Sequence, residues 1–201
     1  RDRSPSRGSE MCIRDSFLSV QEIIIIENWA DIENITPQPF PTGKIILQYA
    51  GNIGRVQGVD KVVEQLPDNV EFHLYGTGAM EEKLKSRKYP KIFFHGPYFR
   101  SQQNKILSAC DIAVVTLQKG MYGLGVPSKT YNILAAGRPI IFFGPEGSEI
   151  DLLVRENGIG YCGWPKVWNR RELIDMGAKA RKLAVRDYSK KVILSKFLDL
   201  I

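Results

Sequence analysis

Short apolar runs rich in β-branched residues alternate with amphipathic segments along most of the chain. The runs predict strands at Ile45–Tyr49, Val70–Tyr75, Ile92–Phe94, Ile112–Thr116, Pro139–Phe143 and Gly160–Cys162. The segments between them predict helices near Val59–Leu66, Met80–Lys88, Ser101–Ala109, Ser128–Ala136 and Ser148–Glu156, and two basic amphipathic helices follow. Strands that alternate with helices form parallel sheets, so the pattern predicts a doubly wound, Rossmann-like α/β fold.

The chain divides into three segments by composition. Residues 1–16 are rich in Arg, Ser and Asp without apolar periodicity, and we interpret them as a cloning artefact or a disordered tail. Residues 17–42 contain one strand-like run and a proline-rich stretch, which indicates an interdomain linker with a remnant of a preceding domain. Residues 43–201 carry the whole strand and helix pattern, so they form the predicted globular domain.

Charge and composition narrow the function only slightly. The net charge of +6 is compatible with nucleic acid, an acidic membrane surface or a phosphorylated small molecule as partner. Three cysteines without C-x-x-C spacing favour a reducing compartment, and two distant histidines without an H-E-x-x-H motif give no reason to expect a metal. The longest apolar run near the start, Ile23–Ile26, is too short to span a membrane.

Glycine follows several of the predicted strands, at Gly51, Gly76, Gly96 and Gly144. Such glycines are ordinary in turns, but parallel sheets of this kind bind ligands at the carboxyl edge of their strands. The loop Gly51–Gly58 resembles a G-x-x-G phosphate loop, yet it matches neither the dinucleotide fingerprint nor the P-loop order. The pattern therefore predicts a phosphate-binding edge and disfavours both NAD binding and P-loop nucleotide hydrolysis.

The most informative stretch runs from Gly123 to Pro139. It places a glycine loop, Pro127, Ser128 and Lys129 directly before a predicted helix. Ser128 suits the N-cap, where its hydroxyl would accept a backbone N–H. Lys129 lies beside the positive end of the helix dipole, which is unfavourable unless an anion lies between them. We therefore expect an anion at Lys129, with a solvated surface lysine as the alternative.

Several of these segments together resemble one enzyme family. Gly51–Gly58, Tyr75–Gly78, Cys110–Val114 and the block Pro127–Pro139 are similar to the donor-binding domain of family four glycosyltransferases. The resemblance extends over about residues 17–201 and is greatest to bacterial surface-polysaccharide enzymes of the fucosaminyltransferase kind. It implies one half of a GT-B fold and a retaining enzyme that uses a nucleoside diphosphate sugar as substrate, without a cofactor.

One feature of the family pattern is absent. Such enzymes commonly carry two glutamates eight positions apart, and Leu124 and Asn132 occupy those positions here. No Asp or Glu occurs between Ile112 and Pro145, which disfavours a carboxylate nucleophile or general base from this region. The sequence instead fits a front-face substitution in which cations stabilise the departing diphosphate, with no metal and no D-x-D motif.

The resemblance also suggests which residues form the site. Lys129 is the first candidate for catalytic charge stabilisation, and Arg55 is the second, although Asn52 and Gln57 occupy the positions of the family's usual arginine and lysine. The candidates for donor binding are Gly51, Asn52, Gly54, Gln57, Gly76, Gly96, Ser128, Tyr131, Asn132, Gly147, Ser148 and Glu149. Each has an ordinary structural alternative: Tyr131 as a core tyrosine, Asn132 as a helix-surface asparagine, and the loop before Ile150 as a helix cap.

From this resemblance we expect the donor-binding half of a glycosyltransferase. The implied donor is UDP-linked, and the acceptor is a glycan or a lipid-linked sugar, as in lipopolysaccharide synthesis, rather than nucleic acid. The acceptor-binding N-terminal domain is expected to be missing, so that the fragment alone would be inactive. The implied location is the cytoplasm, with possible peripheral contact with the inner face of the cell membrane. The alternative is a non-catalytic nucleotide-binding or regulatory module on the same fold, because both glutamates are replaced.

Overall fold

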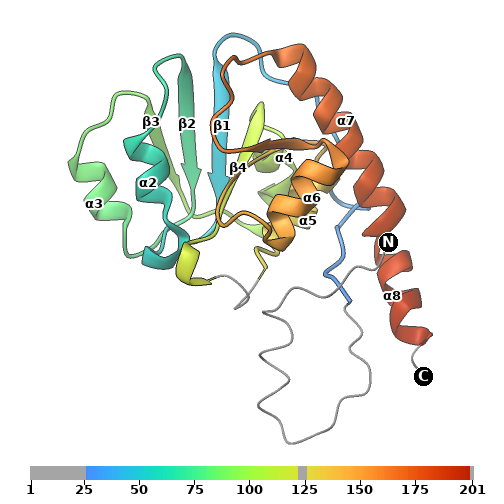
Figure 1. Ribbon diagram of the computed structural model, residues 1–201. Coiled ribbons are helices and arrows are strands. Elements are labelled where there is room, and N and C mark those ends of the chain that lie inside the picture. Colours follow the sequence, from blue (N-terminus) through green and yellow to red (C-terminus); the bar gives the residue numbers. More distant parts are fainter. Residues whose placement is uncertain (1–25, 122–125, 200–201) are drawn as a thin grey trace, which may run out of the picture.

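Six parallel strands form the centre of the molecule (Figure 1). The computed structural model describes residues 26–121 and 126–199, and the strand order is β3-β2-β1-β4-β5-β6. Every neighbouring pair is parallel, so the predicted doubly wound, Rossmann-like α/β sheet is confirmed. The strands are β1 Ile45–Ala50, β2 Val70–Tyr75, β3 Ile92–Gly96, β4 Ile112–Thr116, β5 Ile140–Phe143 and β6 Gly160–Cys162.

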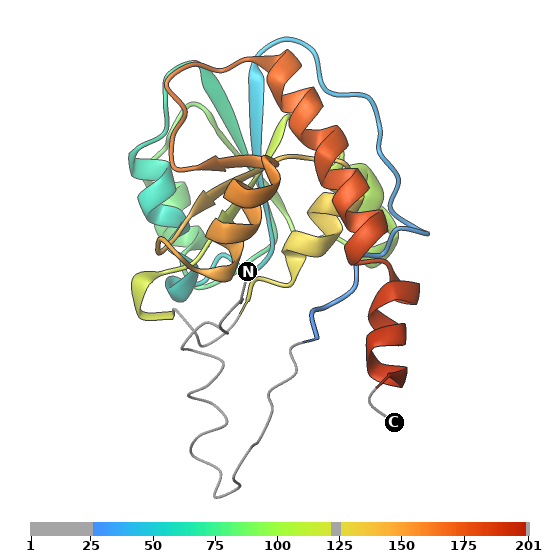
Figure 2. The ribbon, with the colours of Figure 1, turned by 45° about the vertical axis from the view of Figure 1, so that its right-hand side comes forward.

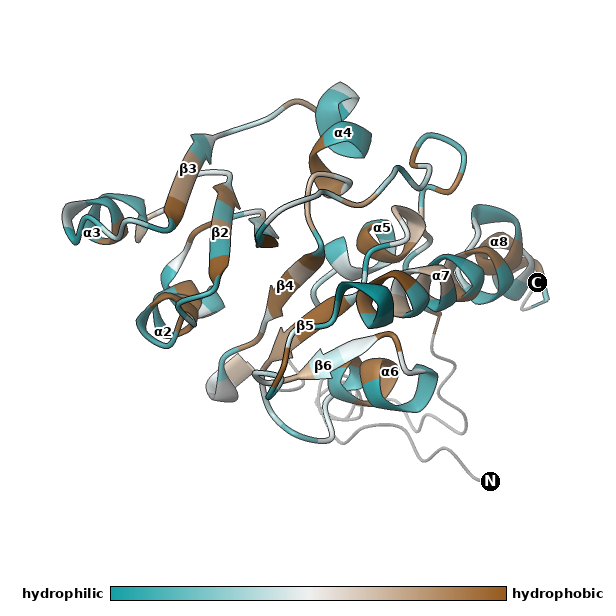
Figure 3. Ribbon diagram, turned by 90° about the horizontal axis from the view of Figure 1, so that it is seen from above, coloured by the Kyte–Doolittle hydropathy of each residue, from teal (hydrophilic) through white to brown (hydrophobic). Residues whose placement is uncertain are grey.

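Helices cover both faces of this sheet, with α2 and α3 on one side and α4 and α5 on the other (Figure 3). They are α2 Val59–Glu64, α3 Glu81–Ser86, α4 Gln103–Leu107, α5 Lys129–Ala135, α6 Glu149–Asn157, α7 Arg170–Asp187 and α8 Lys190–Leu198. The long helix α7 contributes to the core on both sides of the sheet. Its Leu173 packs in the core on the side of α2 and α3, and its Leu183 packs in the core on the side of α4 and α5. None of the helices in the described ranges has the length and apolar character needed to cross a membrane.

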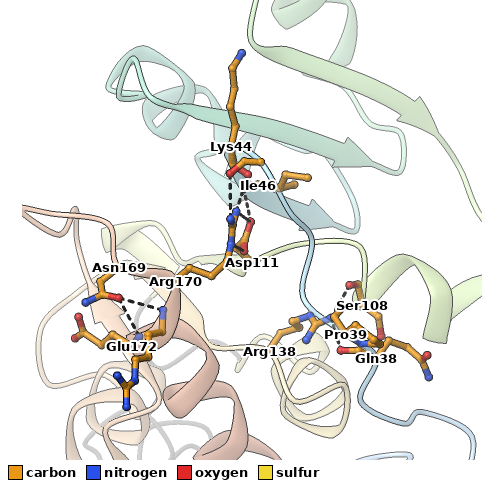
Figure 4. A network of polar contacts seen from close by, with 12 residues as sticks. Gln38, Pro39, Lys44, Ile46, Ser108, Asp111, Arg138, Asn169, Arg170 and Glu172 are labelled. Atoms are coloured by element: carbon orange, nitrogen blue, oxygen red, sulfur yellow. Dashed lines mark hydrogen bonds and ion pairs between the residues drawn. The ribbon is translucent and has the colours of Figure 1, made fainter.

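An ion pair between a buried carboxylate and a half-buried guanidinium joins three elements at the amino edge of the sheet (Figure 4). Asp111 is fully buried directly before β4, and its two carboxylate oxygens accept hydrogen bonds of 2.7 and 3.2 Å from Arg170 at the start of α7. The same carboxylate accepts the backbone N–H of Ile46 on β1 at 2.8 Å. Arg170 also donates to the carbonyl oxygens of Gly43 and Lys44. This pair therefore sets where β1, β4 and α7 begin.

A second buried cation holds the segment before β1 against the domain. The guanidinium of Arg138 donates to the carbonyl oxygens of Gln38, Pro39 and Ser108 at 2.9, 3.0 and 2.7 Å (Figure 4). It also lies 4.0 Å from the ring centroid of Phe40. Arg138 thus has a structural role in the Gly-Arg-Pro block that the sequence analysis associated with the glycosyltransferase family.

The described part of the expected linker packs closely on the domain. Figure 2 shows it, in blue, running beside α7. Ala30 and Ile35 are buried, and the guanidinium of Arg181 on α7 donates to the carbonyl oxygens of Ile32 and Ile35. The proposed boundaries at residues 17 and 43 stay a prediction, and residues 1–25 lie outside the described residues.

Removal of the Asp111 carboxylate tests the importance of the amino-edge ion pair. We expect Asp111→Ala to lower the free energy of unfolding by about 3 kcal/mol or more, because it removes the only carboxylate that pairs with Arg170 among the described residues and leaves the Ile46 N–H without its acceptor. Urea denaturation measures this change. The control is Asp175→Ala, an exposed position on α7, the helix that carries Arg170. Here we expect the free energy of unfolding to change by no more than about 0.5 kcal/mol. Equal effects of the two variants would contradict the structural role of Asp111.

Candidate functional site

Three glycine loops meet at the carboxyl edge of the sheet, as predicted. Gly51 donates its backbone N–H to the carbonyl oxygen of Tyr75 at 2.9 Å, and Gly76 donates to that of Gly96 at 2.7 Å. Gly76 has a φ of 121°, and a Cβ at this position would overlap the carbonyl oxygen of Gly51. Only glycine therefore permits the loops after β1 and β2 to approach this closely.

Lys129 is the first residue of α5 and directs its side chain towards these loops. Its Nζ lies 3.3 Å from the ring centroid of Tyr49, and a Cβ on Gly51 would be 3.8 Å from it. The ammonium is buried and has no hydrogen-bond acceptor among the residues that the structure describes. Burial lowers the pKa of Lys129 to about 7. The site thus contains a buried, unpaired cation, which is the property that an anionic ligand requires.

Tyr49 is a residue of this site that the sequence analysis missed. It is 1% exposed near the end of β1, and its hydroxyl donates to the carbonyl oxygen of Asn52 at 2.8 Å. Burial raises the pKa of Tyr49 to about 12. Its position two residues before Gly51 could have been noticed, but the contact with Lys129 depends on how α5 packs at the sheet edge.

The other candidates on the first loop have different surroundings. Arg55 lies in a 3₁₀ turn, Arg55–Gln57, and is exposed, while its carbonyl oxygen accepts a hydrogen bond from Gln118 at 2.6 Å. The side chain of Gln57 folds against Gly54, where a Cβ would overlap its amide oxygen. The amide of Asn52 lies against Gly78 of the neighbouring loop in the same way. The role of Arg55 as a second cation stays a prediction.

The expected side-chain cap by Ser128 is wrong. Ser128 has helical dihedral angles, φ −58° and ψ −24°, and its side chain makes no capping hydrogen bond. An N-cap residue needs an extended backbone to turn its hydroxyl towards the first helical N–H groups. The turn already begins at Pro127, whose carbonyl oxygen accepts the N–H of Thr130 at 3.0 Å. Ser128 is exposed, and donor binding by this residue stays a prediction.

Tyr131 and Asn132 both have protein partners. Tyr131 is buried, and its hydroxyl lies 3.3 Å from a carboxylate oxygen of Glu149 at the start of α6. The amide oxygen of Asn132 accepts the backbone N–H of Asp31 at 3.0 Å. The structure therefore shows Tyr131 as the core tyrosine that the sequence analysis weighed, whereas Asn132 is partly buried and bonds the segment before β1 instead of lying on the helix surface. Their binding of a donor is untested, and Leu124 lies outside the described residues.

The loop before α6 uses its polar groups internally. The backbone N–H of Gly147 donates to the carboxylate of Asp151 at 2.9 Å, and the hydroxyl of Ser148 donates to the carbonyl oxygen of Pro145 at 2.7 Å. These contacts have the form of a helix-start turn. Donor binding by Gly147, Ser148 and Glu149 stays a prediction.

A cavity of about 610 Å³ opens beside the loops after β1, β4 and β5. This volume is within the range of small-molecule sites. Residues that line it include Gln57, Gly58, Gln118, Gly144 and Glu146. No group of three His, Cys, Asp or Glu side chains suited to a metal ion occurs within the described ranges.

Comparison with known proteins identifies the family. Residues 45–162 match the family described as Glycosyl transferases group 1. The chain belongs to this glycosyltransferase family. The match covers the sheet from β1 to β6, including the glycine loops and Lys129.

The relatives of this glycosyltransferase chain are bacterial enzymes. Probable glycosyltransferase WbjE of Pseudomonas aeruginosa is 30% identical over 95% of the chain and 55% of its own length. Poly(ribitol-phosphate) alpha-N-acetylglucosaminyltransferase of Staphylococcus aureus is 27% identical over 90% of the chain and 40% of its own length. The chain thus spans about half or less of these relatives. HepE of Anabaena, solved with UDP and glucose, shares the fold with a TM-score of 0.73 and 13% identity, over 97% of this chain and 61% of its own.

The pKa of Lys129 predicts how the stability of this glycosyltransferase chain depends on pH. The unfolded chain keeps the ammonium protonated up to the ordinary pKa of 10.5, whereas the folded chain without ligand releases the proton at about 7. The wild type is therefore least stable relative to Lys129→Met below about pH 7 and recovers as the pH rises towards 10.5. We expect the total recovery to be on the order of 4 kcal/mol.

Urea denaturation of both proteins at about pH 6, 8 and 10 measures this recovery. Lys182→Met, on the exposed side of α7, serves as the control and should show no comparable dependence. If Lys129→Met differs from the wild type by the same free energy at every pH, the ammonium is not buried without a partner.

Proposed function

We propose that the chain is the donor-binding half of a retaining glycosyltransferase. The enzyme transfers a sugar from a UDP-linked donor to a glycan or lipid-linked acceptor in the synthesis of a bacterial surface polysaccharide. The observation that carries this proposal is the buried ammonium of Lys129, which has no acceptor within the described part of the chain and lies beside Gly51. A diphosphate would supply the missing negative charge.

Two further observations support this choice of ligand. The loops after β1, β2 and β3 bring backbone groups of Gly51, Gly76 and Gly96 to the same edge as Lys129, and glycine permits a phosphate to approach a backbone closely. Among proteins of this fold, HepE was solved with UDP and glucose. The name of the S. aureus relative describes transfer of N-acetylglucosamine to a polymer.

The residues of the site favour a reaction driven by departure of the diphosphate. In this reaction the bond from the anomeric carbon to the diphosphate oxygen breaks while the acceptor hydroxyl oxygen attacks from the same face. The acceptor proton goes to the departing diphosphate, whose developing charge Lys129 stabilises. A well-aimed donor of this kind contributes about 3 kcal/mol to stabilisation of the transition state. Arg55, which is exposed in the loop after β1, would add a second cation.

The proposed function also implies a second domain and a place of action in the cell. The acceptor would bind to an N-terminal domain that faces the carboxyl edge, so this chain alone would bind the donor without turnover. An enzyme that uses a UDP-linked sugar and a lipid-linked acceptor would work in the cytoplasm at the membrane surface. The exposed basic residues at the start of α8, Lys190 and Lys191, are compatible with contact to anionic lipid, whereas Lys196 pairs with Glu27.

A non-catalytic nucleotide-binding module is the second candidate. It is favoured by Asn132, which replaces a family carboxylate and whose amide oxygen is occupied by the backbone of Asp31. Such a module would use Lys129 to bind a diphosphate but would transfer no sugar.

Binding of UDP tests the shared part of both candidates. We expect Lys129→Ala to weaken UDP binding about 10- to 100-fold, because the charge-assisted hydrogen bond to the diphosphate is lost. Isothermal titration calorimetry measures the dissociation constant, and Lys182→Ala is the matched lysine control on α7. An unchanged affinity in Lys129→Ala would remove this residue from the donor site.

Sugar transfer then separates the enzyme from the module. In a protein that joins this chain to its acceptor domain, transfer from a UDP-sugar is expected, and Lys129→Ala should lower kcat/KM about 100-fold or more. Product formation from a radiolabelled donor provides the measurement. Nucleotide binding without transfer would favour the non-catalytic module, and transfer by this chain alone would show that no second domain is needed.

A further inference from the structure

The contact between Tyr49 and Lys129 joins two distant parts of the sequence at the centre of the candidate site. Tyr49 comes from β1, and Lys129 is the first residue of α5. The ammonium lies 3.3 Å from the ring centroid, which is well inside the range of a cation–π contact. The face of this ring is the attractive group that the described residues provide for the ammonium, which has no hydrogen-bond acceptor there.

The side chain of a lysine at this position could adopt other conformations. Its four-carbon side chain is flexible, and at a surface the ammonium normally reaches water. Burial without an acceptor is costly, and the positive end of the α5 dipole adds to the cost. The negative face of the Tyr49 ring offsets part of this cost, and the lowered pKa of Lys129 shows that the rest remains.

The ring itself is held firmly. Tyr49 is 1% exposed, and its hydroxyl donates to the carbonyl oxygen of Asn52 at 2.8 Å. Asn52 belongs to the loop that follows β1, between Gly51 and Gly54. One side chain thus contacts both the cation and the backbone of the loop proposed to bind the diphosphate.

We propose that Tyr49 is a positioning residue of the donor site: its ring face holds the ammonium of Lys129 beside the Gly51 loop, ready to meet a diphosphate. This role rests on the proposed function, but the coupling between ring and ammonium exists without any ligand. Tyr49 does not react and does not touch the transferred sugar. Its contribution acts through the location and the charge of Lys129.

The charge state of Lys129 gives a direct measure of this coupling. Burial lowers its pKa to about 7, and no charged neighbour within the described residues contributes to the shift. A cation–π contact favours the charged form, so loss of the ring face should lower the pKa of Lys129 further. A purely structural role of Tyr49 would not lower this pKa, because loss of packing would admit water and raise it.

The experiment compares variants that separate the ring from the hydroxyl. Tyr49→Phe keeps the ring, Tyr49→Leu removes it, and Tyr49→pentafluorophenylalanine keeps the shape while reversing the electrostatics of the face. The pKa of Lys129 is followed by NMR of ¹³C-labelled lysine, and UDP affinity by calorimetry. Tyr161→Leu, a half-buried tyrosine on β6, is the matched control for loss of an aromatic side chain.

We expect Tyr49→Phe to keep the Lys129 pKa within about 0.3 pH units, and the UDP dissociation constant within about 2-fold, of the wild type. The Leu and pentafluorophenylalanine variants should lower the pKa by about one pH unit and weaken UDP binding about 5- to 30-fold. If Tyr49→Leu does not fold, the pentafluorophenylalanine variant decides the question, because its ring fills nearly the same space.

Two results would overturn the proposal. One is a Lys129 pKa that stays unchanged in the pentafluorophenylalanine variant, and the other is an equal loss of UDP affinity in Tyr49→Phe, which would assign the effect to the hydroxyl. Failure of the wild type to bind UDP would instead refute the proposed function. The NMR comparison would still decide whether the ring holds the ammonium.

Discussion

The ion pair between Asp111 and Arg170 is the constraint on which the arrangement of the sheet depends. It lies at the amino edge, where one carboxylate is shared by the backbone of β1, the start of β4 and the first turn of α7. The same carboxylate that anchors β1 at Ile46 precedes β4, and the register pairs Leu47 with Ile112 and Gln48 with Ala113. Parallel β1 and β4 therefore both run from this ion pair towards the opposite edge, where the glycine loops and Lys129 lie.

The cations at the two edges of the sheet have different partners. At the amino edge, the half-buried Arg170 is paired with a carboxylate. The Nη2 of the buried Arg138 donates to three carbonyl oxygens, while its Nε and Nη1 have no acceptor among the described residues. At the carboxyl edge, the ammonium of Lys129 has only a ring face. The ion pair of Arg170 stabilises the folded chain, whereas an anion beside Lys129 would supply the acceptor that its ammonium lacks among the described residues. Under the proposed function, the amino edge would thus serve stability and the carboxyl edge ligand binding.

Much of this architecture could be predicted from the sequence. The ends of the strands were predicted to within two residues, because short apolar runs rich in β-branched residues are typical of buried strands. Lys129 was found because a cation at a helix start is unfavourable without an anion. The Ser128 cap was wrong because the preceding proline already begins the helical turn. Tyr49 was missed because its contact spans 80 positions and depends on side-chain packing, which local patterns do not encode.

The buried segment around Ala30 connects the two ends of the described chain. Its backbone N–H donates to the carbonyl oxygen of Tyr188 at 2.7 Å, and Ala30 pairs with Ser189 in a parallel bridge where α7 gives way to α8. The backbone before β1 and the backbone between α7 and α8 therefore lie side by side and are joined by hydrogen bonding. A change in the position of α8 relative to α7 would therefore act directly on the segment around Ala30, because a backbone hydrogen bond and a bridge join the two.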